Sequence, residues 1–350
     1  MTKRAAALCG GVALCVLTLG RAVQAQDSEI VVLDYPGFER PEFHQAYVAA
    51  HGQSPTFSFF GDEEEAFQKV QAGFQTDVTS ICAGSVPKWQ ESGIIEPWDT
   101  SRIEAFADLD ANLLGEHAEG EDVWFIPTYF GTTAVAYNPD EVPAEDVATL
   151  DVFRNPAYAG RVSIPDNVDD AWALAYLATG VTSWDEVDDA RMEAAAQWLR
   201  EVHPNLRTYW TDPAELAQLM STGEVLVAWA WNETYPTMRE EGRPIAFQRA
   251  AAEGSSVWLC GMVNMANAPG SEDKVYDYMN AFLSPGSVRP LVENGWGSAN
   301  AAATAEQVSA EELEAVGLGE VDAPIFAQTP IPIPMRERHA EVFEQIKSGF

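Results

Sequence analysis

Residue types that favour extended backbone fill the stretch 124–138, whose sequence is WFIPTYFGTTAVAYN. Gly131 interrupts this run where the backbone needs freedom or room, so we predict two strands joined at the glycine. Such a bent crossing carries a chain from one lobe to the next, although an ordinary hairpin or edge strand fits the stretch equally well. Pro127 has no N–H for a sheet ladder, which argues against an interior place for the first strand.

Short apolar runs alternate with amphipathic stretches along the rest of the chain. Strands are predicted at 29–33, 56–60, 77–81, 161–164, 224–231 and 255–265. Helices are predicted at 41–51, 62–74, 171–179, 185–203, 211–222, 271–283 and 336–348. This alternation is typical of an α/β fold with a doubly wound parallel sheet. Ligands of such sheets collect at the carboxyl ends of the strands, where the loop 34–38 follows the first strand.

The N-terminal segment differs from the rest. Residues 1–25 combine a basic start, an apolar run too short to span a bilayer and the sequence Val23-Gln24-Ala25, which together predict a cleaved signal peptide. The remaining stretch of about 325 residues is long for one core. We predict two lobes, 26–132 plus 258–300 and 133–257 plus 301–350, with the strand 255–265 as the return crossing.

Acidic residues dominate the chain. Without the predicted signal peptide it carries 17 basic residues against 54 acidic ones, a net charge near −37. This charge excludes nucleic acid as a natural partner, because phosphate binding needs a basic surface. It favours a cationic ligand electrostatically. A solvated acidic surface that keeps the protein soluble explains the same composition.

Two cysteines remain outside the predicted signal peptide, Cys82 and Cys260, and a lone pair in an oxidising compartment is a disulfide candidate. The five histidines show no metal-ligand spacing, and neither HExxH nor GxSxG is present. We therefore expect a protein that is not an enzyme and needs neither cofactor nor metal. A hydrolase that uses two aspartates of the cluster 166–170 is the alternative, and a ferric-ion binder would need clustered tyrosines.

Five aromatic residues lie at strand ends or in glycine-rich loops, where they can form walls around a flat or cationic ligand. They are Tyr35, Phe38, Trp231, Trp258 and Trp296. Core packing is the alternative for each. Three aspartates at the start of the helix 171–179 are helix caps and dipole partners in one reading and ligand carboxylates in the other. They are Asp166, Asp169 and Asp170.

Four local motifs occur in an order and spacing that resemble one family. They are Ile126-Pro127 with Gly131-Thr132-Thr133-Ala134, the segment 156–161 (PAYAGR), the segment 221–225 (STGEV) leading to Trp231-Asn232, and Trp258 in the return crossing. From about Ile30 to Phe350 the chain is similar to the spermidine/putrescine-binding proteins of bacterial ABC transporters. The resemblance implies an α/β, two-lobe periplasmic binding protein fold, type II-like, with a hinged cleft that closes over a small amine. It implies a periplasmic protein that works with an inner-membrane permease, and we expect a monomer.

The resemblance also places a ligand site. By position, the aromatic box of the family falls on Tyr35, Trp231, Trp258 and Trp296. Its acidic pair falls on Asn167 and Asp170, with Asp166 and Asp169 able to substitute. A family glutamine falls within a residue or so of Gln328.

Two positions depart from the family. Cys260 stands where a polyamine binder has an aspartate that holds one ammonium, and Cys82-Ala83-Gly84 stands where Ser-Thr-Tyr is usual. An ammonium buried without its carboxylate is strongly destabilised. We expect a Cys82–Cys260 disulfide to replace this polar subsite and shorten the pocket, so that the ligand is smaller or singly charged, such as putrescine or a related amine. A binder of an amino-acid derivative, opine or betaine is the alternative, and a sensor would need the same closed surface as a transporter.

Overall fold

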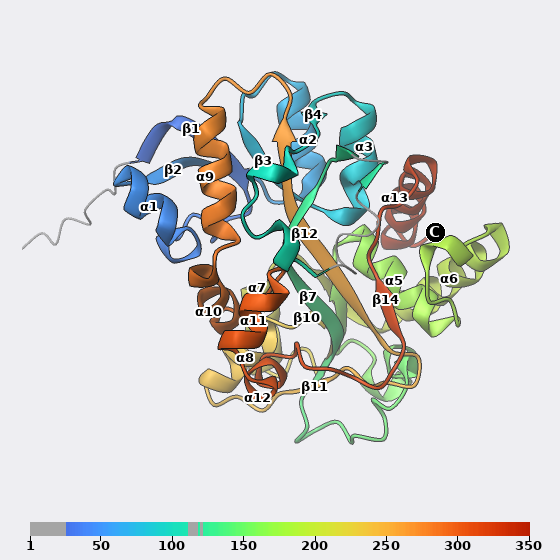
Figure 1. Cartoon of the computed structure of the whole chain (residues 1–350). Coiled ribbons are helices and arrows are strands. Elements are labelled where there is room, and N and C mark those ends of the chain that lie inside the picture. The colour runs from blue at the N-terminus through green and yellow to red at the C-terminus, as the bar shows by residue number, and fades with distance from the viewer. Residues whose placement is uncertain (1–25, 111–117, 120–121) are drawn as a thin grey trace, which may run out of the picture.

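The computed structural model of the 350-residue chain describes residues 26–110, 118–119 and 122–350. The predicted signal peptide, 1–25, lies outside these residues. A mixed sheet runs through the molecule along the path β2-β1-β3-β12-β7-β10-β8-β9. Helices surround both ends of this path (Figure 1).

The secondary structure elements have the following bounds. The strands on the main path are β1 (Gln26–Asp34), β2 (Ser54–Phe59), β3 (Val78–Cys82), β7 (Ile126–Tyr137), β8 (Val162–Pro165), β9 (Leu206–Trp210), β10 (Val227–Trp231) and β12 (Ser255–Met265). The short strands are β4 (Ile95–Glu96), β5 (Ala118–Glu119), β6 (Asp122–Val123), β11 (Ala246–Gln248), β13 (Gly297–Ser298) and β14 (Ile325–Ala327). The α-helices are α1 (Gln45–His51), α2 (Glu63–Gln71), α3 (Val86–Glu91), α5 (Val168–Ala178), α6 (Asp189–Val202), α7 (Pro213–Ser221), α8 (Thr234–Glu240), α9 (Glu272–Phe282), α10 (Pro285–Glu293), α11 (Ala301–Gln307), α12 (Ala310–Ala315) and α13 (Ile333–Lys347).

Two long antiparallel strands, β7 and β12, join the two ends of the sheet at its centre. The stretch predicted as two strands is one continuous strand, β7, and Gly131 lies within it opposite Trp258. The glycine is needed because a Cβ there would lie 2.1 Å from the Trp258 ring. Pro127 also lies within this interior strand, contrary to the prediction. It sits where the register of β12 shifts between Cys260 and Gly261, and such an irregularity accommodates a residue without an N–H.

The outer strands are parallel to their neighbours on each side of the central pair. β1 pairs in parallel with β2 and β3, and β8 pairs in parallel with β9 and β10. We call β1, β2 and β3 with α1, α2, α3, α9 and α10 the β1 side. We call β8, β9 and β10 with α5, α6, α7, α8 and α13 the β8 side (Figure 1). The predicted α/β class is confirmed, but the main path of the sheet is parallel only in its outer strands, because β7 and β12 are antiparallel to their neighbours on that path.

Each side has an apolar core of its own. On the β8 side, Trp172, Tyr176 and Trp229 are fully buried in one cluster. On the β1 side, Phe43 and Tyr278 belong to a separate cluster and are fully buried as well. Burial of one such side chain contributes about 1.5–3 kcal/mol. The two cores therefore hold the helices of each side onto its own strands.

Two elements, α10 and β14, were not predicted from the sequence. α10 begins at Pro285, where proline fits because the first N–H of a helix has no partner to lose. β14 follows Pro324 and pairs in parallel with the start of β12, from Ser255 opposite Ile325. α13 follows six residues after the end of this short strand.

The disulfide expected from the resemblance is present. Cys82 at the end of β3 and Cys260 in β12 are opposite each other in the antiparallel ladder and are bonded. The bond ties the β1 side to the central strand over a sequence separation of 178 residues.

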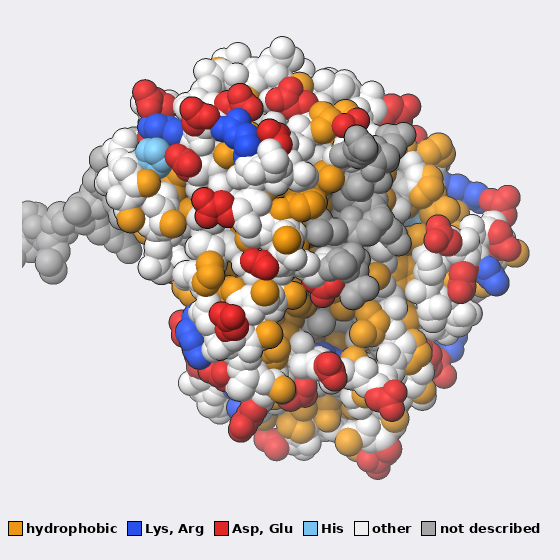
Figure 2. Space-filling view, viewed as in Figure 1, with side chains coloured by type: hydrophobic (Ala, Val, Ile, Leu, Met, Phe, Trp, Pro, Cys, Tyr) orange, Lys and Arg blue, Asp and Glu red, His pale blue; other side chains and the backbone are white. Residues whose placement is uncertain are grey.

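Acidic side chains are spread over the surface in Figure 2, with fewer basic ones among them. Some basic groups are shared between acids, as where Arg102 pairs with Glu272 and Asp273 at 2.9 and 2.7 Å. In the part of the chain that the structure describes, no helix combines the length and the apolar character that a membrane span requires.

Replacement of Gly131 tests the close crossing of β7 and β12. A Cβ at residue 131 would lie 2.1 Å from Trp258 Cζ2 and 2.7 Å from Asn232 Oδ1. We expect Gly131→Ala to lower the free energy of unfolding by about 1–3 kcal/mol, because overpacking displaces both neighbours. Gly286→Ala is the control, since its Cβ would meet only the Ser284 hydroxyl at 3.5 Å. Equal urea midpoints for the two variants would contradict this account of the crossing.

Candidate ligand-binding site

Four aromatic rings from distant parts of the chain pack together, and we call them the ring cluster. Phe38 comes from the loop after β1, Tyr129 from β7, Trp258 from β12, and Trp296 from the turn after α10. The ring centroid of Phe38 lies 4.5 Å from that of Trp296 and 4.5 Å from that of Tyr129. Tyr129 meets Trp258 edge-on at 6.0 Å. The ring cluster therefore combines residues of the β1 side with residues of the two central strands.

Two further aromatic residues flank the ring cluster. Tyr35 packs against Phe60 with their centroids 4.4 Å apart, and Trp231 meets Trp210 edge-on at 4.7 Å. Both are partly exposed and pack against the hydrophobic cluster that contains Phe38 and the other rings. All five aromatic residues named from the sequence thus share one cluster. Tyr35, Phe38, Trp231 and Trp296 lie at strand ends or in turns as predicted, whereas Trp258 lies within β12, where it crosses Gly131 of β7.

Asp170 is held beside Trp231 by three uncharged donors. Its Oδ2 accepts a hydrogen bond from Trp231 Nε1 at 2.6 Å. Its Oδ1 accepts from Thr133 Oγ1 and from Gln328 Nε2, each at 2.8 Å. Thr133 lies in β7, and Gln328 follows β14, whose pairing with β12 sets its place. Three residues named from the sequence, Asp170, Trp231 and Gln328, therefore form one hydrogen-bonded group.

The charge of Asp170 has no cationic partner among the residues that the structure describes. The side chain is 2% exposed, and the groups that act on it are three neutral donors and the acidic Asp169. Its place in the first turn of α5 supplies only the partial positive charge of a helix start. Burial raises the pKa of the Asp170 carboxyl to about 6, although its hydrogen bonds favour the ionised form. At neutral pH the site holds a buried carboxylate whose charge is not neutralised.

Glu233 supplies a second carboxyl, which the sequence reasoning missed; the residue is partly exposed, but one of its carboxylate oxygens is buried. It follows β10 by two residues, and its Oε1 accepts a hydrogen bond from Trp296 Nε1 at 2.7 Å. Its Oε2 is buried and has no hydrogen-bond partner among the described residues. Burial raises the pKa of Glu233 to about 7. The rule that ligands meet the carboxyl ends of strands could have singled it out, since it stands in the loop directly after a buried strand.

Two further carboxylates, one from each side of the molecule, are bridged by one arginine. Arg336 of α13 lies 3.8 Å from Glu63 Oε2 and 3.4 Å from Asp169 Oδ1. Glu63 Oε1 also accepts from the Tyr35 hydroxyl at 3.2 Å and from the Cys82 N–H at 2.6 Å. These two carboxylates have a cation of the protein itself, in contrast to Asp170. No local pattern in the sequence marks Arg336, because its partners are distant along the chain.

Two residues named from the sequence are engaged elsewhere. Asp166 is exposed and forms an ion pair with Lys347 at 2.6 Å. Asn167 is exposed, and its Oδ1 accepts from the backbone N–H of Asp170 at 3.0 Å, which makes it the N-cap of α5. One oxygen of each side chain is therefore used, by an ion pair in Asp166 and by a helix cap in Asn167. We leave both out of the candidate site.

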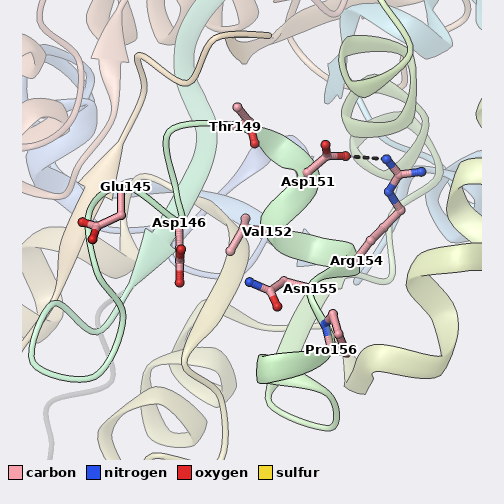
Figure 3. A pocket seen from close by; sticks show the side chains of 8 residues that line it. All are labelled: Glu145, Asp146, Thr149, Asp151, Val152, Arg154, Asn155 and Pro156. Atoms are coloured by element: carbon pink, nitrogen blue, oxygen red, sulfur yellow. Dashed lines mark hydrogen bonds and ion pairs between the residues drawn. The ribbon is translucent and has the colours of Figure 1, made fainter.

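A surface hollow of about 430 Å³ lies in the segment 145–156 on the β8 side (Figure 3). It is lined mostly by polar groups, and Asp151 and Arg154 in its wall form an ion pair. None of the candidate ligand-binding residues named from the sequence lines it. Across the described ranges, no group of three or more His, Cys, Asp or Glu side chains is arranged to hold a metal ion. The hollow offers neither aromatic walls nor an unpaired buried charge, so we centre the candidate site on the ring cluster.

Comparison with known proteins identifies relatives over most of the chain. The family described as bacterial extracellular solute-binding protein matches residues 42–315. The spermidine/putrescine-binding periplasmic protein of Escherichia coli K12 is 27% identical over 293 residues, 82% of each chain. The putrescine/agmatine-binding protein of Pseudomonas aeruginosa is 25% identical over 356 residues, 95% of each chain.

Solved structures show the same fold. The PBP MotA of A. tumefaciens B6, in complex with glucopine, superposes with a TM-score of 0.75 at 18% identity, covering 91% of this chain and 99% of that one. The two-lobe periplasmic binding protein fold expected from the sequence is confirmed. A neighbour that holds glucopine shows that this fold accommodates solutes other than polyamines.

The stability of the ligand-free protein is expected to depend on pH through Asp170. Its pKa is about 6 in the folded state and 3.8 in its unperturbed form, so between these values the folded state binds more protons than the unfolded state. Stability therefore falls as the pH rises from 4 to 6, by at most about 3 kcal/mol from this group. We expect Asp170→Asn to remove that part of the slope in urea unfolding measured at pH 4, 5, 6 and 7. Identical slopes for the variant and the unchanged protein would contradict the assignment.

Proposed function

The chain belongs to the bacterial extracellular solute-binding proteins, the substrate-binding components of ABC transporters, and we propose that its solute is a small cationic amine. Solute-binding proteins are not enzymes, so the chemistry required of the site is recognition. We propose that the solute lies between the ring cluster, Tyr35 and Trp231 on one hand and the Asp170 carboxylate on the other.

The uncompensated charge of Asp170 is the observation that carries this proposal. A buried carboxylate without a counter-ion is costly, and an ammonium that enters beside it relieves the cost while gaining a charge-assisted hydrogen bond. Indole and phenol rings attract the same cation through their faces, at about 0.5–2 kcal/mol for each contact. An anionic solute would meet Asp170 and Glu233 with like charge. The site therefore supports a cation.

The relatives agree with the charge argument without fixing the solute. The E. coli and P. aeruginosa proteins are named for spermidine, putrescine and agmatine, all of which are amines. The disulfide supports a short solute, because Cys82 and Cys260 form an apolar bridge next to Tyr129 in the ladder. We propose a solute of the size of putrescine.

A zwitterion such as an amino-acid derivative, opine or betaine is the second candidate. One observation favours it: the Arg40 guanidinium carbon lies 5.9 Å from the Trp296 ring centroid and could receive a carboxylate. Arg40 Nε already lies 3.7 Å from the Glu42 carboxylate, in an ion pair, and donates a hydrogen bond to the carbonyl of Gly37. It is also partly exposed, so the simple amine remains the better fit.

The proposal extends to how the protein works. We propose that residues 1–25 are removed in export to the periplasm and that the mature monomer delivers its solute to an inner-membrane permease. We further propose that the predicted lobes, 26–132 plus 258–300 and 133–257 plus 301–350, close around the solute as hinged bodies. Packing of Ala303 and Val308 against the α10 residues Val288 and Val292 favours counting residues 301–308 with the first body.

Calorimetric titration with putrescine tests the role of Asp170. We expect Asp170→Asn to weaken binding at least about 30-fold, because removal of one partner of a buried charge pair costs about 2–5 kcal/mol. Asp166→Asn is the matched control, since that exposed aspartate pairs with Lys347 and should change the affinity less than about threefold. Equal loss in both variants, or none in either, would overturn the assignment.

A further inference from the structure

Glu233 and Asp170 each accept a hydrogen bond from an indole N–H beside the rings, and neither forms an ion pair with a residue that the structure describes. Resting on the amine function above, we propose that Glu233 is a second ammonium acceptor, so that the site selects a linear dication over a monocation of the same length.

The backbone holds Glu233 in a fixed place. The neighbouring Asn232 is fully buried, and its Oδ1 accepts from the N–H of Thr132 at 3.0 Å. Its Nδ2 donates to the carbonyls of Gly295 and Val316. A Cβ at Gly295 would lie 3.1 Å from the Glu233 Cα, so the two loops touch. Glu233 is thereby fixed against the turn that carries Trp296.

The side chain of Glu233 is only half satisfied. Oε1 accepts from the indole N–H of Trp296 at 2.7 Å, whereas the buried Oε2 has no hydrogen-bond partner among the described residues. The charged groups that act on it, Asp170 and Asp212, are both acidic. A buried acceptor without a donor is destabilising, and more so when it is charged. The group that would satisfy Oε2 is therefore a donor from outside the protein, and a cationic one.

Two indole–carboxylate pairs have the same construction. Trp231 Nε1 donates to Asp170 at 2.6 Å, and Trp296 Nε1 donates to Glu233 at 2.7 Å. An indole N–H lies in the ring plane, so each carboxylate stands at a ring edge and leaves ring faces for apolar or cationic contact. A chain of methylene groups with an ammonium at each end matches this pattern, because its middle packs on rings while each end meets a carboxylate.

A purely structural role for Glu233 is the competing explanation. In that case the carboxyl would only hold the Trp296 ring against Phe38. Glu233→Gln separates the two roles, since the amide oxygen still accepts from the indole N–H while the negative charge is lost. Glu241→Gln, at an exposed position after α8, is the matched control for loss of one acidic charge.

The experiment compares putrescine with n-butylamine, which has the same carbon chain and one ammonium. We expect the unchanged protein to bind putrescine at least about 30-fold more tightly than n-butylamine. Glu233→Gln should lose at least about 10-fold in affinity for putrescine while its affinity for n-butylamine changes less than about threefold, which also shows that the variant is folded. Glu241→Gln should leave both affinities unchanged.

The outcomes separate this inference from the function on which it rests. Equal weakening of both amines in Glu233→Gln, or no weakening of putrescine, would overturn the role of Glu233 and leave the amine function standing. A protein that binds neither amine, or an Asp170→Asn variant that binds both as before, would overturn the amine function itself.

Discussion

One electrostatic constraint governs the candidate site: the Asp170 carboxylate is buried among rings and has no cationic partner among the residues that the structure describes. Asp170 is enclosed by Thr133, Gln328 and Trp231, which orient it without cancelling its charge. Each donor comes from a different element, and the three meet only because β7, β10 and β14 converge there. Three neutral hydrogen bonds thus orient the Asp170 carboxylate without neutralising its charge. This arrangement suits the recognition of a cation and is unfavourable for the stability of the free protein.

Close packing around the central strands keeps this arrangement rigid. Gly131 lets the Trp258 ring lie directly against β7, and the Cys82–Cys260 disulfide fixes β3 to the same part of β12. Arg336 forms ion pairs with Glu63 of the β1 side and Asp169 of the β8 side. The Arg336 guanidinium neutralises Glu63 and Asp169. Asp170 and Glu233 have no such partner among the residues that the structure describes.

Local patterns in the sequence were sufficient for most of the fold and for part of the site. Alternating apolar runs located β1, β3 and β12 to within a few residues, and the rings gathered as expected because strand ends converge in an α/β sheet. Contacts between residues far apart in the sequence leave no local pattern. The ion pairs of Arg336 and the hydrogen bond between Trp296 and Glu233 were therefore not predicted. The role of Asn167 could not be read from the sequence, because an asparagine before a helix can be a helix cap or a ligand contact; in the structure its Oδ1 caps α5. Pro127 looked incompatible with an interior strand because a register shift in the partner strand leaves no trace in the sequence.

The central claim is that a ligand cation neutralises these buried acids, and proton release on binding measures this most directly. With pKa values of about 6 for Asp170 and about 7 for Glu233, the free protein at pH 6.5 holds about one proton on the two groups together. An ammonium beside them lowers both pKa values and expels that proton, while the amine itself stays charged. Titration of putrescine at pH 6.5 in buffers of different ionisation enthalpy should therefore show release of about one proton. A binding heat that is the same in every buffer would contradict the account.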